Sequence, residues 1–269
     1  MSRRILSGAA LVCALSVLPL AGALAQDCCP VVELRQYTLY PGKRDELITL
    51  FEQRFIESQE ATGMRIAATF RDLADPDRFV WVRGFTDMKK RHDALTAFYY
   101  GPVWQTYREQ ANATLADNDN VLLLRPAYPG SGFALDGLVR PASGPAAGPV
   151  TGGRLVVATI YYLRADTLPG FATAFRRDMA PLLERSGTRI LAQYVSEKSP
   201  NTFPRLPVRE QEHVFVVFAT FDDADAYLRQ QRALGADERR RSVLATQAAA
   251  MERAPETLLL QPTARSLVR

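Results

Sequence analysis

The chain carries an internal repeat, and this repeat constrains the fold more than any other feature of the sequence. Three pairs of matched segments define it, namely residues 37–39 with 161–163, 63–66 with 187–190, and 122–126 with 258–262. The first two pairs are 124 positions apart and the third is 136 apart, so the second copy is 12 residues longer between Tyr194 and Phe215. Because the spacing persists across a strand, a helix and another strand, we infer a duplication in which both copies share one fold.

Each copy follows the order strand–helix–strand–strand–helix–strand. In the first copy we expect strands at residues 31–39, 64–71, 79–85 and 121–125, and helices at 43–60, 87–99 and 103–115. This order is the split βαβ or ferredoxin-like arrangement, of the α+β class. Its antiparallel sheet has helices on one face only, so the other face must be covered. We expect two such sheets to stack as a barrel, closed by the other half of the chain, by another chain, or by both.

Composition divides the 269 residues into four segments. Residues 1–25 are predicted to be a signal peptide, and residues 26–128 the first ferredoxin-like module. Residues 129–153 contain 11 Gly or Pro residues among 25, which predicts a linker. Residues 154–269 are predicted to be the second, degenerate module.

The first segment has the pattern of an export signal. Arg3 and Arg4 precede an apolar run, and Ala23-Leu24-Ala25 is a small-x-small cleavage site. The alternative is a transmembrane anchor, which needs about 20 unbroken apolar residues, whereas Pro19 interrupts this run. We therefore expect a periplasmic or extracellular protein without an integral membrane segment after cleavage.

Cleavage would remove Cys13 and leave Cys28 and Cys29 near the new N-terminus. An oxidising compartment permits disulfides. Three interpretations remain open for this pair: a tether between the chains of a homo-oligomer, a contact to a soft metal ion, or a tail without an essential role.

Several classes of partner are not indicated. Loss of Arg3 and Arg4 lowers the formal net charge from +4 to about +2, and the sequence has no concentrated basic patch of the kind that nucleic-acid binding requires. The two histidines and the cysteine pair do not form a metal-ligand spacing. We find no phosphate loop or nucleophile elbow, and we expect no metal, no cofactor and no nucleic acid.

Charged and aromatic side chains alternate with aliphatic ones in the strands of the first copy. The charged and aromatic set comprises Glu33, Arg35, Tyr37, Arg71, Trp81 and Arg83. We expect the aliphatic set to pack under the helices and the charged set to face the barrel lumen. One carboxylate cannot neutralise three guanidinium groups there, so the lumen is predicted to bind a small anionic or aromatic ligand. The alternative is a salt-bridged interface whose acids come from the partner sheet.

The second copy lacks almost all of this set. The repeat places Val157, Thr159, Val195, Val217 and Ala219 at the charged or Trp positions, and only Tyr37 is retained, as Tyr161. We therefore interpret the first module as the functional copy and the second as an architectural cover.

Two further groups lie on the predicted helices. His92 is expected to be partly buried, because it shares a helical face with Met88, Leu95 and Tyr99. The aromatic residues around the Gly101-Pro102 break belong either to the core or to the mouth of a cavity.

The runs VELRQYTLYPGK (32–43), DPDRFVWVRGF (75–85) and GPVW (101–104) resemble a NIPSNAP domain, as do residues 112–114 and 119–124. The resemblance spans about residues 31–127 and implies a dimeric α/β-barrel, ferredoxin-like fold. That superfamily includes cofactor-independent monooxygenases, haem-degrading enzymes and small stress-response proteins, and the NIPSNAP family has no agreed reaction. Animal members are mitochondrial proteins linked to membrane traffic and mitophagy, whereas this chain carries an export signal.

The sequence leaves three hypotheses open. The first is an exported binding or interaction protein whose first module takes a small anionic or aromatic ligand. The second is a cofactor-independent monooxygenase or isomerase, in which Arg35, Arg71 or Arg83 holds an oxyanion. Glu33 or His92 would then be the base. The third is a purely structural role, so the sequence does not decide whether the protein is an enzyme.

Overall fold

A computed structural model describes residues 29–142 and 154–269 of the chain. The first module contains β1 (Val31–Leu39), α1 (Arg44–Leu50), η1 (Phe51–Phe55), α2 (Ile56–Glu60), β2 (Arg65–Asp72), β3 (Arg78–Phe85), α3 (Met88–Tyr99), α4 (Pro102–Asn112) and β4 (Leu115–Pro126). The second contains β5 (Leu155–Tyr162), α5 (Leu168–Ala174), η2 (Phe175–Met179), α6 (Ala180–Arg185), β6 (Arg189–Ser196), β7 (Val214–Phe221), α7 (Ala224–Ala236), α8 (Glu238–Ala248) and β8 (Glu256–Pro262).

The two modules repeat one another in register, which confirms the tandem ferredoxin-like fold. Glu33 lies opposite Arg83 in the β1–β3 pair, and Val157, its counterpart, lies opposite Ala219 in the β5–β7 pair. The first helical layer contains one π-helical turn, η1, and the second contains another, η2, beginning 124 positions later. A turn of this kind is rare and often occurs at functional sites, and both copies have kept it.

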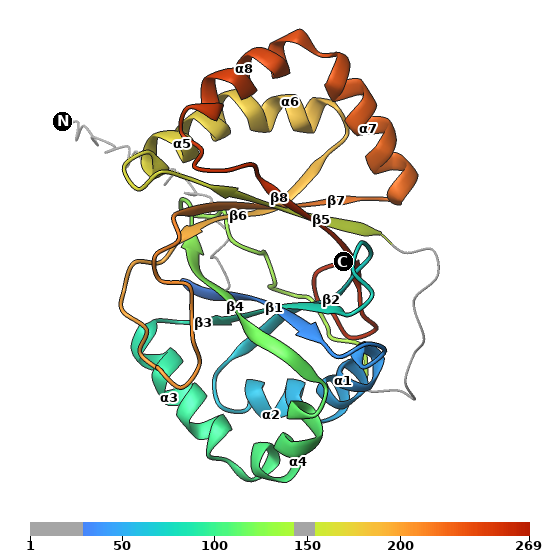
Figure 1. Ribbon diagram of the computed structural model, residues 1–269, viewed down its shortest axis with the longest axis vertical. Coiled ribbons are helices and arrows are strands. Elements are labelled where there is room, and N and C mark those ends of the chain that lie inside the picture. Colours follow the sequence, from blue (N-terminus) through green and yellow to red (C-terminus); the bar gives the residue numbers. More distant parts are fainter. Residues whose placement is uncertain (1–28, 143–153) are drawn as a thin grey trace, which may run out of the picture.

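The strands of the described residues form one closed antiparallel barrel in the order β1-β3-β2-β8-β5-β7-β6-β4. Helices α1–α4 cover one side of it and α5–α8 the opposite side (Figure 1). The modules join where β2 pairs with β8 and where β4 pairs with β6. Of the alternatives that the sequence left open, the barrel therefore closes within a single chain.

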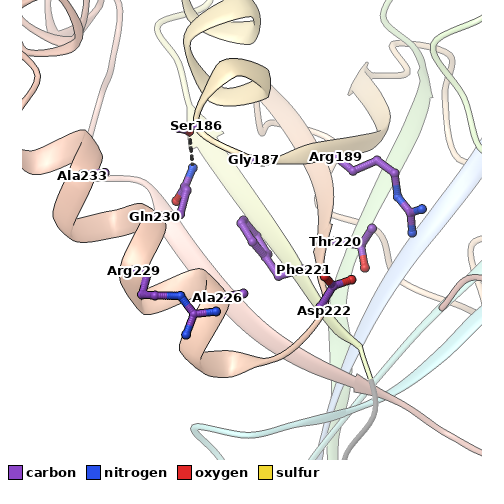
Figure 2. Close-up of a pocket in the computed structure, with 10 residues that line it drawn as sticks. All are labelled: Ser186, Gly187, Arg189, Thr220, Phe221, Asp222, Ala226, Arg229, Gln230 and Ala233. Atoms are coloured by element: carbon purple, nitrogen blue, oxygen red, sulfur yellow. Dashed lines mark hydrogen bonds between the residues drawn. The ribbon is translucent and has the colours of Figure 1, made fainter.

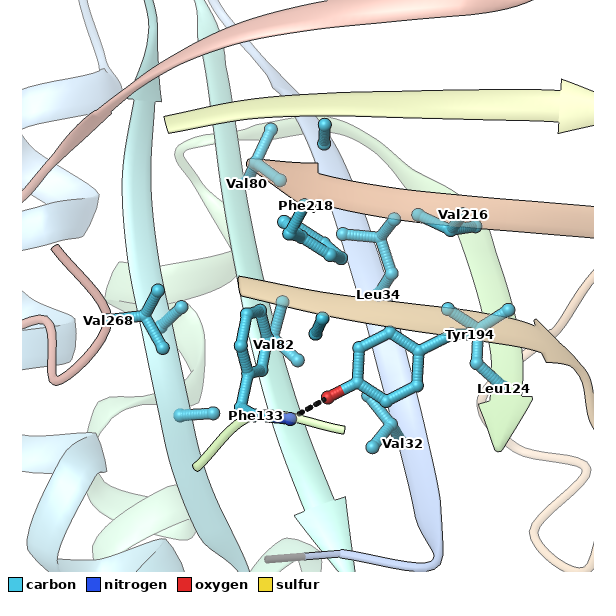
Figure 3. Packing of buried hydrophobic residues seen from close by; sticks show 14 of the residues in the cluster. Val32, Leu34, Val80, Val82, Leu124, Phe133, Tyr194, Val216, Phe218 and Val268 are labelled. Carbon is cyan, nitrogen blue, oxygen red and sulfur yellow. Dashed lines mark hydrogen bonds between the residues drawn. The ribbon is translucent and has the colours of Figure 1, made fainter. Parts of the chain in front are cut away.

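The barrel interior is apolar, and this corrects the predicted orientation of the strands. Val32, Leu34 and Val82 of the first module pack against Val216 and Phe218 of the second between the sheets (Figure 3). The charged and aromatic set lies on the other face, under the helices. The reason is that the lumen is enclosed by strands whose backbone groups are already paired, so a charge there would find few partners. The helix side offers polar side chains and a loop.

The segment after β4 contributes to the same interior. Phe133 packs on Phe218, with ring centroids 5.0 Å apart, and its backbone N–H donates to the Tyr194 hydroxyl at 2.9 Å (Figure 3). Val268, near the C-terminus, is also buried there. Both modules and both of these segments therefore contribute to one shared core.

The predictions for the N-terminus fall largely outside the described residues. Residues 1–25 and Cys28 are not described, so the export signal stays a prediction. Cys29 is 5% exposed and disulfide-bonded, and lies against Gly84. Burial argues against Cys29 as a tether between chains. Across the described part of the chain, every helix is too short or too polar to span a bilayer.

A ligand pocket under the first helical layer

A cavity of about 170 Å³ lies between the sheet of the first module and its helices. Its walls include six buried or half-buried aromatic residues, Phe51, Phe55, Trp81, Phe98, Tyr99 and Trp104. The polar groups at this cavity include Tyr37 and Gln59. An apolar concave site with a few polar groups is the usual form of a small-molecule pocket.

The π-helical turn places two of the aromatic walls. Phe51 and Phe55 mark the two ends of η1, and both are almost fully buried against the sheet. Phe51 meets Trp81 with ring centroids 4.7 Å apart, and Phe55 meets Trp104 at 5.6 Å. These edge-to-face and tilted contacts hold both indole rings at the cavity.

A buried ion cluster stands beside the cavity. Glu33 Oε2 accepts from Arg35 Nη1 at 2.7 Å and from Arg83 Nε at 2.8 Å, and Glu33 Oε1 accepts from Arg91 Nε at 2.6 Å. All four side chains are fully buried. Three guanidinium groups face one carboxylate, so the cluster has an excess of positive charge.

Two residues connect this charge to the cavity. Arg35 Nε donates to the Tyr37 hydroxyl at 3.0 Å, and Arg83 Nη1 donates to Gln59 Oε1 at 3.0 Å. Tyr37 and Gln59 both line the cavity. Because the Tyr37 oxygen already accepts from Arg35, the hydroxyl proton is available to a ligand.

Several buried donors at and behind the cavity have no hydrogen-bond acceptor among the described residues. They are Arg35 Nη2, Arg91 Nη2, Trp81 Nε1 and Trp104 Nε1. A buried donor left unpaired costs about 1–3 kcal/mol. A ligand with oxygen acceptors, or ordered water, would recover part of that free energy.

The charges determine the protonation states of the cluster. Burial alone would raise the pKa of the Glu33 carboxyl, but Arg83, Arg35 and Arg91 outweigh it and hold that pKa well below its usual range. Burial raises the pKa of the Tyr37 hydroxyl, although Arg35 opposes the shift. Glu33 therefore stays ionised and Tyr37 stays protonated near neutral pH. The low pKa makes Glu33 a weak base, and both of its carboxylate oxygens already accept from arginines.

The low pKa of Glu33 predicts a specific loss of stability in acid. In the unfolded chain the carboxyl titrates near 4.5, so the stabilisation is complete above that pH and is lost as the pH falls towards the folded-state pKa. We expect each pH unit in that window to lower the free energy of unfolding by about 1.4 kcal/mol. Urea unfolding from pH 7 to pH 3 measures this, with Glu33→Gln as the reference. Parallel pH profiles for the two proteins would contradict the assignment.

A loop from the second module covers this pocket. Residues 197–213, between β6 and β7, contain the 12 residues that the second copy gained, and they reach across to α3 (Figure 1). Asn201 Oδ1 accepts from Arg91 Nη1 at 2.9 Å, and Phe203 stacks on Tyr99 at 5.9 Å. Arg205 and Leu206 line the cavity. The extra length of one copy thus completes the site of the other.

The structure separates two predicted site residues from the rest. Arg71 is buried, and its Nη2 donates to Asp45 Oδ1 of α1 at 2.9 Å. Arg71 does not line the cavity and does not contact Glu33. His92 is exposed, and its Nδ1 lies 2.6 Å from the Thr202 carbonyl oxygen. The expectation of a partly buried His92 is therefore wrong, and His92 does not reach the cavity as a base.

Sequence reasoning missed Arg91 and Gln59. The inward face of α3 is formed by Arg91, Ala94, Leu95 and Phe98, at the spacing of an amphipathic helix. Aligning the face on Leu95 and Phe98 would have indicated Arg91 as the inward residue and His92 as its outward neighbour. Gln59 occupies a similar inward position at the end of α2.

A metal site and a surface cavity were the other candidates on the described residues, and both have less support than the pocket of the first module. They contain no group of three or more His, Cys, Asp or Glu placed to hold a metal ion. A cavity of about 420 Å³ lies between the ends of β6 and β7 and helix α7 (Figure 2). Its charged groups, Arg189, Asp222 and Arg229, are exposed, so their interactions with a ligand would be weakened by water and salt.

The comparisons agree with this architecture. An anthrone oxidase-like protein is 15% identical, with a TM-score of 0.57, over 89% of this chain and 94% of that one. A proposed monooxygenase from Lactobacillus acidophilus is 12% identical, with a TM-score of 0.52, over 88% of this chain and 98% of that one. At these identities the likeness establishes the fold alone. No curated protein matches the chain.

The family match falls on the module that holds the pocket. Residues 32–128 match the NIPSNAP family, and this segment includes the ion cluster and helices α1–α4. This segment of the chain is therefore a NIPSNAP domain, and it forms the first module of the ferredoxin-like barrel.

Proposed function

We propose that this protein is exported and binds a small aromatic molecule with an anionic or hydroxyl head group in the pocket of its first module. The observation that carries the proposal is the pair of Tyr37 and Arg35, in which an arginine of a net positive cluster donates to a tyrosine that lines an aromatic cavity. Phenols and aromatic carboxylates have the matching chemistry, a flat ring and an oxygen acceptor.

The size of the cavity favours a ligand with a single aromatic ring. A cavity of roughly 150 Å³ suffices for benzene, and this one measures about 170 Å³. Aromatic walls would contact the faces and edges of the ring. The Tyr37 hydroxyl would donate to the phenolate or carboxylate oxygen, supported by the positive charge behind it.

The pocket has a built-in optical probe. The chain has two tryptophans, Trp81 and Trp104, and both line this cavity. Titration with 4-hydroxybenzoate, followed by tryptophan fluorescence, is therefore expected to report on this pocket rather than on the second module. Benzylamine, with the opposite charge, is the control ligand. Equal responses to the two ligands would contradict the proposed charge preference.

We expect Tyr37→Phe to weaken 4-hydroxybenzoate binding by about tenfold or more, because the variant keeps the ring and removes the donor to a charged oxygen. Tyr161→Phe is the matched control, since Tyr161 is the counterpart of Tyr37 in the other module. Fluorescence titration of the three proteins gives the dissociation constants. Unchanged affinity in Tyr37→Phe would remove Tyr37 from the site.

The second candidate function is a cofactor-independent monooxygenase acting on an enolisable aromatic substrate. It is favoured by the names of the fold relatives and by the Tyr37–Arg35 pair, which could hold a developing oxyanion. Against it, three arginines lower the pKa of Glu33 and so make it a weak base, and His92 does not line the cavity. Oxygen consumption with hydroquinone substrates, lost in Tyr37→Phe, would favour this candidate over simple binding.

Export and assembly belong to the same proposal. Residues 1–25 support export through their arginines, apolar run and cleavage site. N-terminal sequencing of the mature protein tests this and is expected to begin at residue 26. Sedimentation of the purified protein tests the proposed homo-oligomer.

A further inference from the structure

The second module has a larger cavity at the place equivalent to the first pocket. It lies between strands β5, β7 and β8 and the helices η2, α6, α7 and α8, and it measures about 460 Å³, against about 170 Å³ in the first module. The two cavities occupy matching positions, because Tyr161 and Val217 line the second as Tyr37 and Trp81 line the first.

Side-chain replacement accounts for the difference in size. The positions that hold Glu33, Arg35, Trp81 and Arg83 in the first module hold Val157, Thr159, Val217 and Ala219 in the second, and all four of these smaller residues line the larger cavity. In the first module the same space contains the ion cluster and an indole ring. The duplication has therefore exchanged a charged, filled layer for an apolar, open one, which the expectation of a purely architectural cover does not explain.

Two polar residues, Tyr161 and Arg240, line this cavity. Tyr161 is 9% exposed. Burial raises the pKa of Tyr161 to about 12, and the charge of Arg240 opposes that shift. Arg240 Nη1 donates to the Leu234 carbonyl oxygen at 3.5 Å, whereas Arg240 Nε is buried without an acceptor among the described residues.

The remaining walls are largely apolar and adaptable. Phe175, Leu244 and Met251 contribute most of their surface as carbon and sulfur. Volumes of about 300–1,000 Å³ are typical of ligand pockets. An apolar body would fit this space, and an anionic head would meet a protonated tyrosine and an arginine whose buried Nε has no acceptor among the described residues.

We propose that the second module binds an amphiphile with a single carboxylate head and an apolar chain, of the size of a medium-chain fatty acid. The carboxylate accepts from Arg240 and from the Tyr161 hydroxyl, and the chain occupies the space vacated by the ion cluster. This site is independent of the ligand proposed for the first pocket.

The test is calorimetric titration of the full protein with decanoate. Arg240→Gln is expected to weaken decanoate binding by about tenfold or more and to leave 1-decanol binding unchanged, because only the charged head needs the arginine. Arg239→Gln is the matched control, since it removes the same charge from an exposed neighbour on α8. Equal affinities in the two variants, or no decanoate binding at all, would overturn the proposal.

A second variant tests the cavity itself. Val217→Phe adds an aromatic ring at the position of Trp81 and is expected to abolish binding of both decanoate and 1-decanol. The variant pair at Arg240 and Arg239 keeps the test valid if Val217→Phe does not fold. Decanoate binding that quenches tryptophan fluorescence and is lost in Tyr37→Phe would place the ligand in the first pocket and refute the second site. If the protein binds decanoate but not 4-hydroxybenzoate, the ligand proposed for the first pocket is wrong and the site in the second module is supported.

Discussion

Replacing Glu33 by Gln is expected to lower the free energy of unfolding by about 3–5 kcal/mol, a large share of the stability of an ordinary domain. The substitution keeps the shape of the side chain and removes the one carboxylate that the three arginines share. Their charges would then lie together, fully buried and uncompensated. Urea unfolding at pH 7 measures the effect.

Glu46→Gln is the control for this result. Glu46 also forms an ion pair, with Lys43 at 2.7 Å, but both side chains are more than 40% exposed. Such a surface pair contributes about 0–1 kcal/mol, so the control should unfold almost as the parent does. A similar small effect at Glu33 would mean that water reaches the cluster and that the positive excess is screened.

The second large effect is expected from Phe218→Ala, which should lower the free energy of unfolding by about 3–5 kcal/mol. Phe218 is fully buried in the barrel interior, with its ring centroid 5.0 Å from Phe133 and 6.2 Å from Tyr194. Truncation leaves a cavity in a core that both sheets share. Leu228→Ala, at a side chain that is 47% exposed, is the control and should change stability little.

This variant also tests whether the two modules unfold together. Both tryptophans lie in the first module, whereas Phe218 lies in the second. If the barrel core is common, tryptophan fluorescence and circular dichroism should report one coincident transition, shifted by the same amount. A fluorescence transition unmoved by Phe218→Ala would show that the modules unfold separately.

The cluster around Glu33 is not required by the fold. The second module builds the same sheet in the same register with Val157 and Ala219 in place of Glu33 and Arg83. Buried ion clusters seldom add stability relative to apolar side chains of similar volume. Folding alone therefore does not explain the cluster in the first module, which supports the ligand site proposed above.

The sequence correctly grouped the residues of the pocket and the ion cluster, but the predicted orientation assigned them to the wrong face of the sheet. Alternation along β1 and β3 correctly placed Glu33, Arg35, Tyr37, Trp81 and Arg83 on one face. It could not tell which face would be inward, because period two separates two sets of side chains without assigning either to a side. Both faces of the sheet are buried, so hydrophobicity could not show which face lies towards the barrel interior and which lies under the helices.

The sequence by itself determined the duplication, the ferredoxin-like order of elements and the sharing of faces within each strand, because these depend on local spacing along the chain. Only the tertiary structure decided that the barrel closes within one chain, that Arg91 joins Glu33, and that residues 197–213 cover the pocket of the other module. These contacts join residues far apart in the sequence. Their pairing depends on how the two helical layers and the barrel pack, and no local pattern encodes it.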